Sequence, residues 1–476
     1  MNKRVQHIIE LMQSGEPENI ALAWQLAASI NEMALFDPLI ALAKLLKMGR
    51  SPKQRVAKIL QQQELFIRGV VFTPQATQGF GTLQKLKHLS FEQCQLKDIP
   101  ESLFELTQLA RFSVVRNEIT SVPDQIGQLV NLTHLGLSIN KIETIPAAIQ
   151  ELKSLSYLSL AINKLKSLPE EIGHLKNLRN LSLEHNQLEA LPKSIGNLEN
   201  LVEMRVEENV LKDLPQSIGG LKNLHSLNLK NNQLQTLPKA LGALTNLKTL
   251  DLSGNHLTEL PETIAQLRHL RCLILTNNHF QQFPLCITAL EELEELRLNG
   301  NQLTTLPEEI GRLKKLKYLQ INNNQIKQLP PSLGQLSQLD DLFIEHNQLK
   351  ALPEEIAKLQ KLKRLWLNNN QLKQLPHSLG SLKKLKHLDL DHNQLSSFPE
   401  STTSLQRLAH LSLAHNQFNH LPEVLISLQK LERLDLTNNL LTHYPEQAKQ
   451  AKKLYWLFLE GNPIEDARAK QNRVGR

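Results

Sequence analysis

The sequence has few of the residues on which several functions depend. Aromatic side chains make up only 4% of its 476 residues, and the three cysteines are the scattered Cys94, Cys272 and Cys286. Three such cysteines are too few for a disulfide framework or a zinc site, so we expect free thiols in the reducing cytoplasm. No apolar run approaches the roughly 20 residues of a membrane helix. Because residues 1–10 also lack the apolar stretch of a secretory signal, we expect neither membrane insertion nor export.

Catalytic signatures are also absent from the sequence. It contains no GxxxxGK[ST] phosphate loop, no GxSxG, no HExxH and no protein-kinase motif set. Its net charge of +7, from 54 basic and 47 acidic residues, is a mild surplus for this length. Nucleic-acid binding would favour a dense basic face with interleaved aromatics. We therefore expect a protein that is not an enzyme, uses no cofactor or metal ion, and has nucleic acid only as a less favoured partner.

A 23-residue repeat governs most of the chain. Asparagine recurs every 23 residues from Asn117 to Asn462, and proline keeps the same spacing. Sixteen full units run over residues 86–453, and a partial unit begins at residue 454. Such a spacing, kept without one insertion, indicates a single array of equivalent structural units.

The unit over residues 178–200 shows the physical reason for each recurring position. Its LxxLxL stretch alternates, so the leucines of a short strand point to one side. Asn186 carries donors and an acceptor that can bond the backbone where the chain leaves the strand, and stacked copies would form a ladder. Cys94, at the same phase, can partly replace asparagine through its weak S–H donor. Pro192 removes a backbone donor, so we expect an extended or loosely helical return, which Gly196 tightens.

One such unit cannot bury its own apolar face, so neighbouring units must stack around a continuous core. We therefore expect an α/β solenoid with about 17 parallel strands along its inner side. The pattern LxxLxLxxNxLxxLPxxIGxLxxL resembles the leucine-rich repeat, in the 23-residue intracellular form of Ras-group and bacterial leucine-rich repeat proteins. The resemblance implies a horseshoe that acts as an interaction scaffold and binds a protein partner on its concave face. By analogy, it also implies a role in signalling, with a small GTPase among the candidate partners.

The two ends of the chain depart from the repeat. Residues 1–70 are typical of a helical N-terminal cap, with helices expected over 3–13, 18–30, 33–48 and 53–66. The solenoid is expected over 71–464, where 71–85 form half of a degenerate repeat. Residues 465–476 form a C-terminal tail, for which we expect a short helix. Residues 1–70 are expected to cap the exposed apolar end of the array, and recruitment of another protein is the alternative.

The outward positions of the later strands carry a distinctive set of side chains. Phe343 and Trp366 fall at equivalent central positions of consecutive strands, so we expect them to stand side by side. Tyr318 and Arg364 lie beside the pair, and acidic residues surround it. The complete predicted site consists of Tyr318, Asp341, Phe343, Glu345, Arg364, Trp366, Asp389 and Asp391. Aromatic residues with an arginine inside a charged rim are typical of a protein-binding hot spot.

Three other interpretations stay open. Isolated surface aromatics often have no function. His346, His392 and His415 share one phase and could bring two imidazoles together for a metal ion, although other polar residues occupy that phase elsewhere. Lysines recur just before the later strands and would line one lateral edge, where they keep the protein soluble, steer an acidic partner or contact nucleic acid. These lysines are Lys314, Lys315, Lys317, Lys361, Lys363, Lys383, Lys384 and Lys386.

Overall fold

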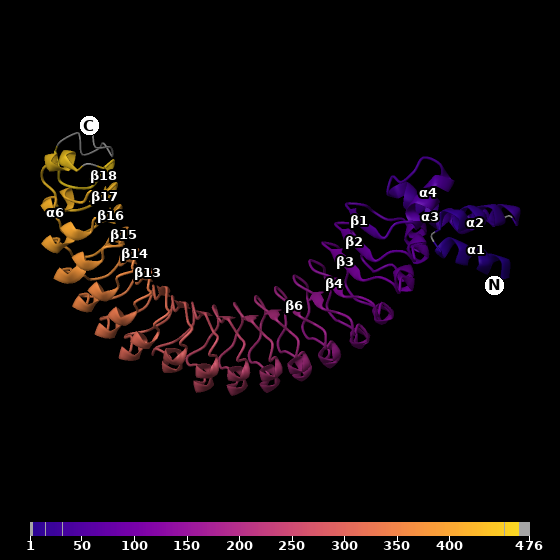
Figure 1. The fold of residues 1–476 in the computed structure, drawn as a ribbon, viewed down its shortest axis with the longest axis horizontal. Coiled ribbons are helices and arrows are strands. Elements are labelled where there is room, and N and C mark those ends of the chain that lie inside the picture. Colours follow the sequence, from indigo (N-terminus) through magenta and orange to yellow (C-terminus); the bar gives the residue numbers. More distant parts are fainter. Residues whose placement is uncertain (1–2, 15, 31, 452, 466–476) are drawn as a thin grey trace. The chain divides into compact units, whose positions relative to one another are not determined.

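The computed structural model describes residues 3–14, 16–30, 32–451 and 453–465 (Figure 1). The chain divides into two compact units, Met1–Gln233 (unit 1) and Leu234–Arg476 (unit 2). The short helix expected within residues 465–476 falls, apart from Glu465, outside the described residues.

Unit 1 begins with helices that pack around an apolar core. They are α1 Lys3–Gln13, α2 Pro17–Ser29, α3 Asp37–Leu45 and α4 Pro52–Leu60, with the 3-10 turn η1 Met33–Phe36 before α3. Ile8 and Met12, four residues apart, bury one face of α1. The first two predicted helices are confirmed, and the third is divided into η1 and α3, which begins beside Pro38. None of the described helices is long and apolar enough to cross a membrane.

The fourth predicted helix, 53–66, is wrong at its end. Helix α4 stops earlier, and Glu64–Arg68 forms strand β1. The reason is an alternation of period two, in which Leu65 and Ile67 are buried while Phe66 between them is 73% exposed. A strand therefore lies inside the segment that was expected to be purely helical.

Strand β1 begins a parallel array one strand earlier than the sequence indicated. It pairs in parallel with β2 His88–Glu92, with Leu65 opposite Leu89. The segment predicted as half of a degenerate repeat holds α5 Pro74–Gln78 and η2 Gly79–Thr82. The described residues thus contain 18 strands, against the expected number of about 17.

Every later repeat adds one short strand. In unit 1 these are β3 Arg111–Val115, β4 His134–Gly136, β5 Tyr157–Ser159, β6 Asn180–Ser182, β7 Glu203–Arg205 and β8 Ser226–Asn228. In unit 2 they are β9 Thr249–Asp251, β10 Cys272–Ile274, β11 Glu295–Arg297, β12 Tyr318–Gln320, β13 Asp341–Phe343, β14 Arg364–Trp366, β15 His387–Asp389, β16 His410–Ser412, β17 Arg433–Asp435 and β18 Trp456–Phe458. Neighbouring strands within a unit pair in parallel, as Leu342 does with Leu365.

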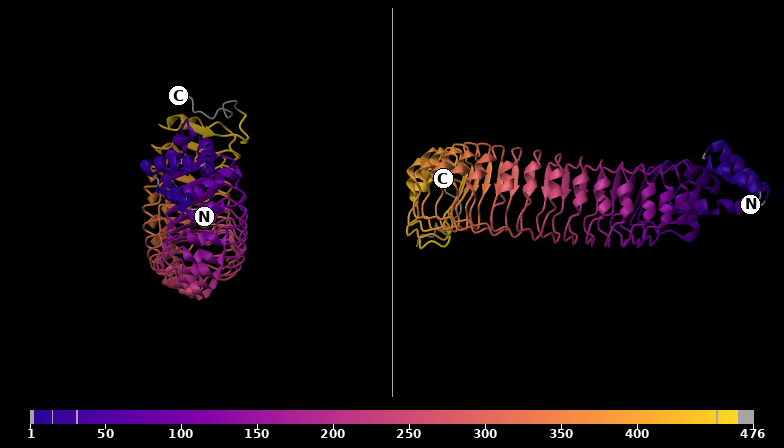
Figure 2. Two further views of the ribbon diagram at one scale, coloured as in Figure 1. Left: turned by 90° about the vertical axis from the view of Figure 1, so that its right-hand side faces the viewer. Right: turned by 90° about the horizontal axis from the view of Figure 1, so that it is seen from below.

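The chain returns from each strand through a helical turn. A five-residue 3-10 turn follows the repeat proline in most repeats, and the short helix α6 Glu423–Ile426 replaces it in one. In each unit the strands form one side of the array and these turns form the opposite side (Figure 1), and the view from below shows the row of turns (Figure 2). The predicted parallel solenoid is confirmed.

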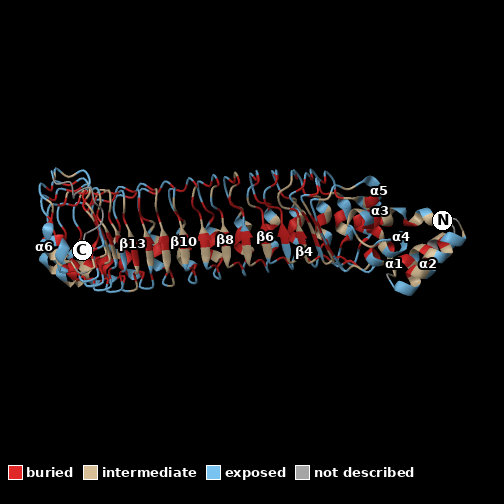
Figure 3. Ribbon diagram, turned by 90° about the horizontal axis from the view of Figure 1, so that it is seen from above, coloured by how far each residue is buried: buried red, intermediate tan, exposed pale blue. Residues whose placement is uncertain are grey.

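The core of each unit lies between the strands and the returning turns. Leu181 and Leu183, both from one LxxLxL stretch, are at most 1% exposed. Exposed residues gather in the loops on either side of the strands (Figure 3). Gly196 allows the turns to stack closely, because a Cβ atom there would lie 1.9 Å from the carbonyl oxygen of Ser217 in the next repeat.

The asparagine ladder joins each repeat to its neighbour. The Nδ2 of Asn278 donates to the carbonyl oxygen of Leu252 at 3.0 Å, and its Oδ1 accepts from the N–H of Leu257 at 3.0 Å. Both partners belong to the preceding repeat. Cys94 takes the first ladder position and donates through Sγ to the carbonyl oxygen of Ile67 at 3.5 Å. The predicted ladder and its cysteine replacement are confirmed.

Candidate functional site

The predicted aromatic pair lies on the outward face of unit 2. The strand register places Phe343 of β13 directly beside Trp366 of β14. The ring centroids of Phe343 and Trp366 are 5.8 Å apart, and those of Tyr318 and Phe343 are 5.1 Å apart. These three partly exposed rings, called the aromatic run below, form a continuous apolar strip across β12, β13 and β14.

Arg364 and Asp341 form an ion pair at the edge of the aromatic run. Nε of Arg364 donates to Oδ1 of Asp341 and Nη2 donates to Oδ2, each at 2.5 Å. Asp341 is only 7% exposed, and its hydrogen bonds raise the pKa of Arg364. The sequence analysis predicted that Asp341 belongs to an open acidic rim. In the structure its carboxylate is instead paired with Arg364.

A second arginine, which sequence reasoning missed, extends the aromatic run. The guanidinium of Arg297 on β11 lies over the ring of Tyr318, 5.2 Å from the centroid, in a cation–π contact. Its Nε also donates to the carboxylate of Glu295. Arg433 lies over Phe458 in the same way, at 4.6 Å. An arginine one strand before an aromatic residue was the available sequence signal for both contacts.

The remaining predicted acidic residues form a group without a cationic partner. Glu345 lies just after β13, Asp389 ends β15, and Asp391 lies just after β15. These three residues are called the acidic trio below. Asp389 is the register partner of Trp366. Burial raises the pKa of all three carboxyl groups, and with the charge of Asp391 it raises the pKa of Asp389 to about 7. Within the described residues, no ion pair includes a member of the trio.

Two polar atoms beside the acidic trio are buried without a hydrogen-bond partner. They are the indole Nε1 of Trp366 and Oδ1 of Asn368, the next outward residue along the chain. Most buried polar atoms in proteins are paired. Both atoms are covered by neighbouring protein atoms, so a molecule from outside can pair with them only after the side chains around them shift.

The backbone conformation explains why His346, His392 and His415 occupy the same position of their repeats. The residue before each ladder asparagine has a positive φ in every repeat from residue 93 to residue 461, with 51° at His392 and 54° at His415. Glycine, asparagine and histidine tolerate this left-handed region best. The rings of His392 and His415 stack with centroids 3.9 Å apart, and burial together with the neighbouring ring lowers the pKa of His392. Over the part of the chain that the structure describes, no group of three or more potential ligands could hold a metal ion.

The predicted lysine edge is partly neutralised by carboxylates of the preceding repeat. The ion pairs are Lys315–Glu292 at 2.5 Å, Lys317–Glu294 at 2.6 Å and Lys363–Asp340 at 2.8 Å. Lys361 instead bonds the amide oxygen of Gln338. Exposed pairs of this kind stabilise little, but they reduce the positive field along the edge.

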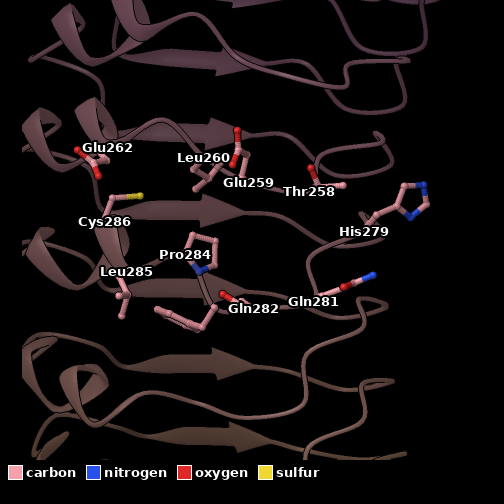
Figure 4. A pocket seen from close by; sticks show the side chains of 11 residues that line it. Thr258, Glu259, Leu260, Glu262, His279, Gln281, Gln282, Pro284, Leu285 and Cys286 are labelled. Atoms are coloured by element: carbon pink, nitrogen blue, oxygen red, sulfur yellow. The ribbon is translucent and has the colours of Figure 1, made fainter.

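An open pocket of about 670 Å³ lies elsewhere in unit 2, between neighbouring repeats. Its lining runs from Thr258 and His279 at one end to Glu262 and Cys286 at the other (Figure 4). Burial raises the pKa of the Cys286 thiol to about 11. The thiol is therefore protonated near neutral pH, and the pocket holds no activated cysteine nucleophile.

Comparison with protein families identifies the repeat. A leucine-rich repeat region model matches residues 147–231, 217–301, 296–369 and 350–457, and a second leucine rich repeat model matches residues 107–165. These matches cover well over half of the chain. The chain is a leucine-rich repeat protein. Among curated proteins, no significant match was found.

Solved structures agree with this assignment. A leucine-rich repeat protein of Leptospira interrogans is 38% identical, with 75% of this chain and 94% of that chain covered and a TM-score of 0.61. The ectodomain of the Arabidopsis receptor kinase HAESA is 28% identical, with coverages of 87% and 72% and a TM-score of 0.64. A TDR receptor is 27% identical, with coverages of 83% and 74% and a TM-score of 0.66. This leucine-rich repeat protein thus has a fold that commonly serves as a protein-interaction scaffold.

Proposed function

We propose that this leucine-rich repeat protein is a non-enzymatic scaffold that binds a protein partner on the outward strand face of unit 2. The contact centres on the aromatic run and extends over β12 to β15. The observation that carries the proposal is the adjacency of Tyr318, Phe343 and Trp366 in a chain with few aromatics. The core does not dictate these outward positions, so packing alone does not explain three large rings there.

Charge and polarity around the aromatic run support the same proposal. Arg364 is fixed by Asp341, so one side of the run carries a rigid polar border. The acidic trio borders the other side. An apolar centre with a polar rim matches the anatomy of protein interfaces, in which buried aromatics supply most of the binding energy.

The family supports a protein or peptide partner. The HAESA ectodomain was solved in complex with a peptide hormone ligand. We extend this mode of action, although not that ligand, to the present chain. A signalling protein such as a small GTPase is the partner class suggested by the repeat type.

We also propose that the protein acts in the cytoplasm. All three cysteines are free, and burial raises the pKa of each thiol. Unpaired thiols of this kind suit a reducing compartment.

The proposal is tested by affinity capture from cells with the wild-type chain and Phe343→Ala/Trp366→Ala. A matched control, Thr249→Ala/Ile274→Ala, truncates two outward residues on β9 and β10, outside the aromatic run. We expect at least one protein to be recovered by the wild type and the control but lost from the aromatic variant. Equal recovery by all three proteins, with equal melting temperatures, would place the binding site elsewhere.

A further inference from the structure

The acidic trio indicates what kind of side chain the partner presents. We propose that the partner of the aromatic run is a protein segment that places a basic side chain, preferably arginine, between Trp366 and the acidic trio. This inference rests on the proposed function and specifies its chemistry.

The first support is that no lysine or arginine of the described residues pairs with the acidic trio. Glu345, Asp389 and Asp391 form no ion pair within the described residues, and the nearby Arg364 is already held by both oxygens of Asp341. His387 and His392 near the trio each stack on a histidine of the next repeat, with centroids 4.7 Å apart for His387 and His410 and 3.9 Å apart for His392 and His415. Burial and the neighbouring ring lower the pKa of His387 and of His392, which weakens both imidazoles as cationic partners of the trio.

The second support is a pattern that the same strand face already uses. Arg297 lies over Tyr318 and bonds the carboxylate of Glu295. Arg433 lies over Phe458 and approaches Asp435, with 3.9 Å between Nη2 and Oδ2. Each pattern combines an aromatic ring, a carboxylate and an arginine, and arginine suits it because the planar guanidinium stacks on rings and bonds carboxylates at once.

At Trp366 the ring and the carboxylates are present, but the arginine is not supplied by this chain. Asp389 lies directly beside Trp366 in the register, and Asp391 follows on the same strand segment. No described arginine or lysine lies over the indole. A basic side chain from a partner would complete the arrangement and rest its methylene groups on the rings.

The third support concerns the backbone of the incoming segment. Nε1 of Trp366 needs an acceptor and Oδ1 of Asn368 needs a donor. A peptide group offers one carbonyl acceptor and one N–H donor. Both atoms are covered in the free protein, so a bound polypeptide pairs them only when Trp366 and Asn368 shift, whereas a free cation would in any case satisfy only the carboxylates.

The test is selection from a displayed library of random twelve-residue peptides against four purified full-length proteins. These are the wild type, Phe343→Ala/Trp366→Ala, Asp389→Asn/Asp391→Asn, and the control Asp251→Asn/Glu259→Gln, which removes two acidic side chains elsewhere in unit 2. We expect the wild type and the control to enrich peptides with arginine or lysine at one fixed position, about tenfold over the starting library. Both site variants should lose this enrichment, and added salt should weaken the binding of a selected peptide to the wild type.

The possible outcomes separate the inference from the proposed function. Peptides that depend on Phe343 and Trp366 but have no basic position, or that bind Asp389→Asn/Asp391→Asn unchanged, would overturn the inference and leave the proposed function standing. Acidic peptides would also overturn the inference. If no selected peptide depends on Phe343 and Trp366, both proposals fail.

Discussion

Arg364 on β14 holds Asp341 on β13 through two parallel hydrogen bonds of 2.5 Å, one from Nε and one from Nη2. The carboxylate is almost completely buried, whereas about half of the arginine side chain is exposed, at 49%. The pair ties two strands of the candidate site together and fixes the border of the aromatic run. Removing this ion pair should therefore lower the stability of the protein more than it changes which partner binds.

Arg364→Ala is expected to destabilise the protein by about 2 kcal/mol, because Asp341 would remain buried without its partner. The neighbouring Lys363→Ala is the control, since its pair with Asp340 is more exposed and should contribute less than about 0.5 kcal/mol. Urea unfolding of both variants measures the difference. Equal stability of the two variants would show that the buried pair contributes no more than a surface pair.

Asn278→Ala is expected to cost about 1–3 kcal/mol, because it leaves buried carbonyl and N–H groups of its own and the preceding repeat without partners. Because repeats are stabilised mainly by their neighbours, the damage should be local. Hydrogen exchange should show lost protection around Leu252 and Leu257, and none with the exposed control Gln281→Ala. Uniform protection along unit 2 in Asn278→Ala would contradict the role of the ladder.

Ile162→Asn is expected to stabilise the protein by about 1 kcal/mol. Ile162 has φ of 56°, where a β-branched side chain is strained, and it is 45% exposed, so the exchange gives up little burial. Asparagine already occupies the same phase at residue 231 with φ of 50°. A melting temperature equal to or below that of the wild type would show that Ile162 makes compensating contacts.

The stability of the folded protein should depend on pH through the acidic trio. The pKa of Asp389 is about 7 in the folded state and about 3.8 in the unfolded chain, so between these values the folded state binds more protons. Ionising Asp389 therefore destabilises the fold as pH rises from 4 to 7. Asp389→Asn should be more stable than the wild type by about 2 kcal/mol at pH 8 and similar to it at pH 4. A constant difference between the two proteins across this range would show that Asp389 titrates normally.

The repeat made much of the fold predictable, because a 23-residue period fixes strand register and ladder together. Phe343 and Trp366 could be placed side by side on that basis alone. β1 was not predicted because its repeat has neither the asparagine nor the proline of the later repeats. Its short alternation of apolar and polar positions also directly follows a helical segment. The same register places Arg364 beside Asp341, but the ion pair itself could not be predicted, since the rotamer of Arg364 decides which carboxylate it reaches. The contact between Arg297 and Tyr318 depends on rotamers in the same way.

The most direct test of the central claim is site-specific photocrosslinking to a captured partner. A photoreactive amino acid replaces Gln320 of β12. This residue lies beside Phe343 of β13 and, like Phe343, points outward. The control replaces Ser113, at the equivalent outward position of β3 in unit 1. We predict a crosslink to the partner from position 320 and none from position 113. A crosslink from position 113 alone would contradict binding at the aromatic run.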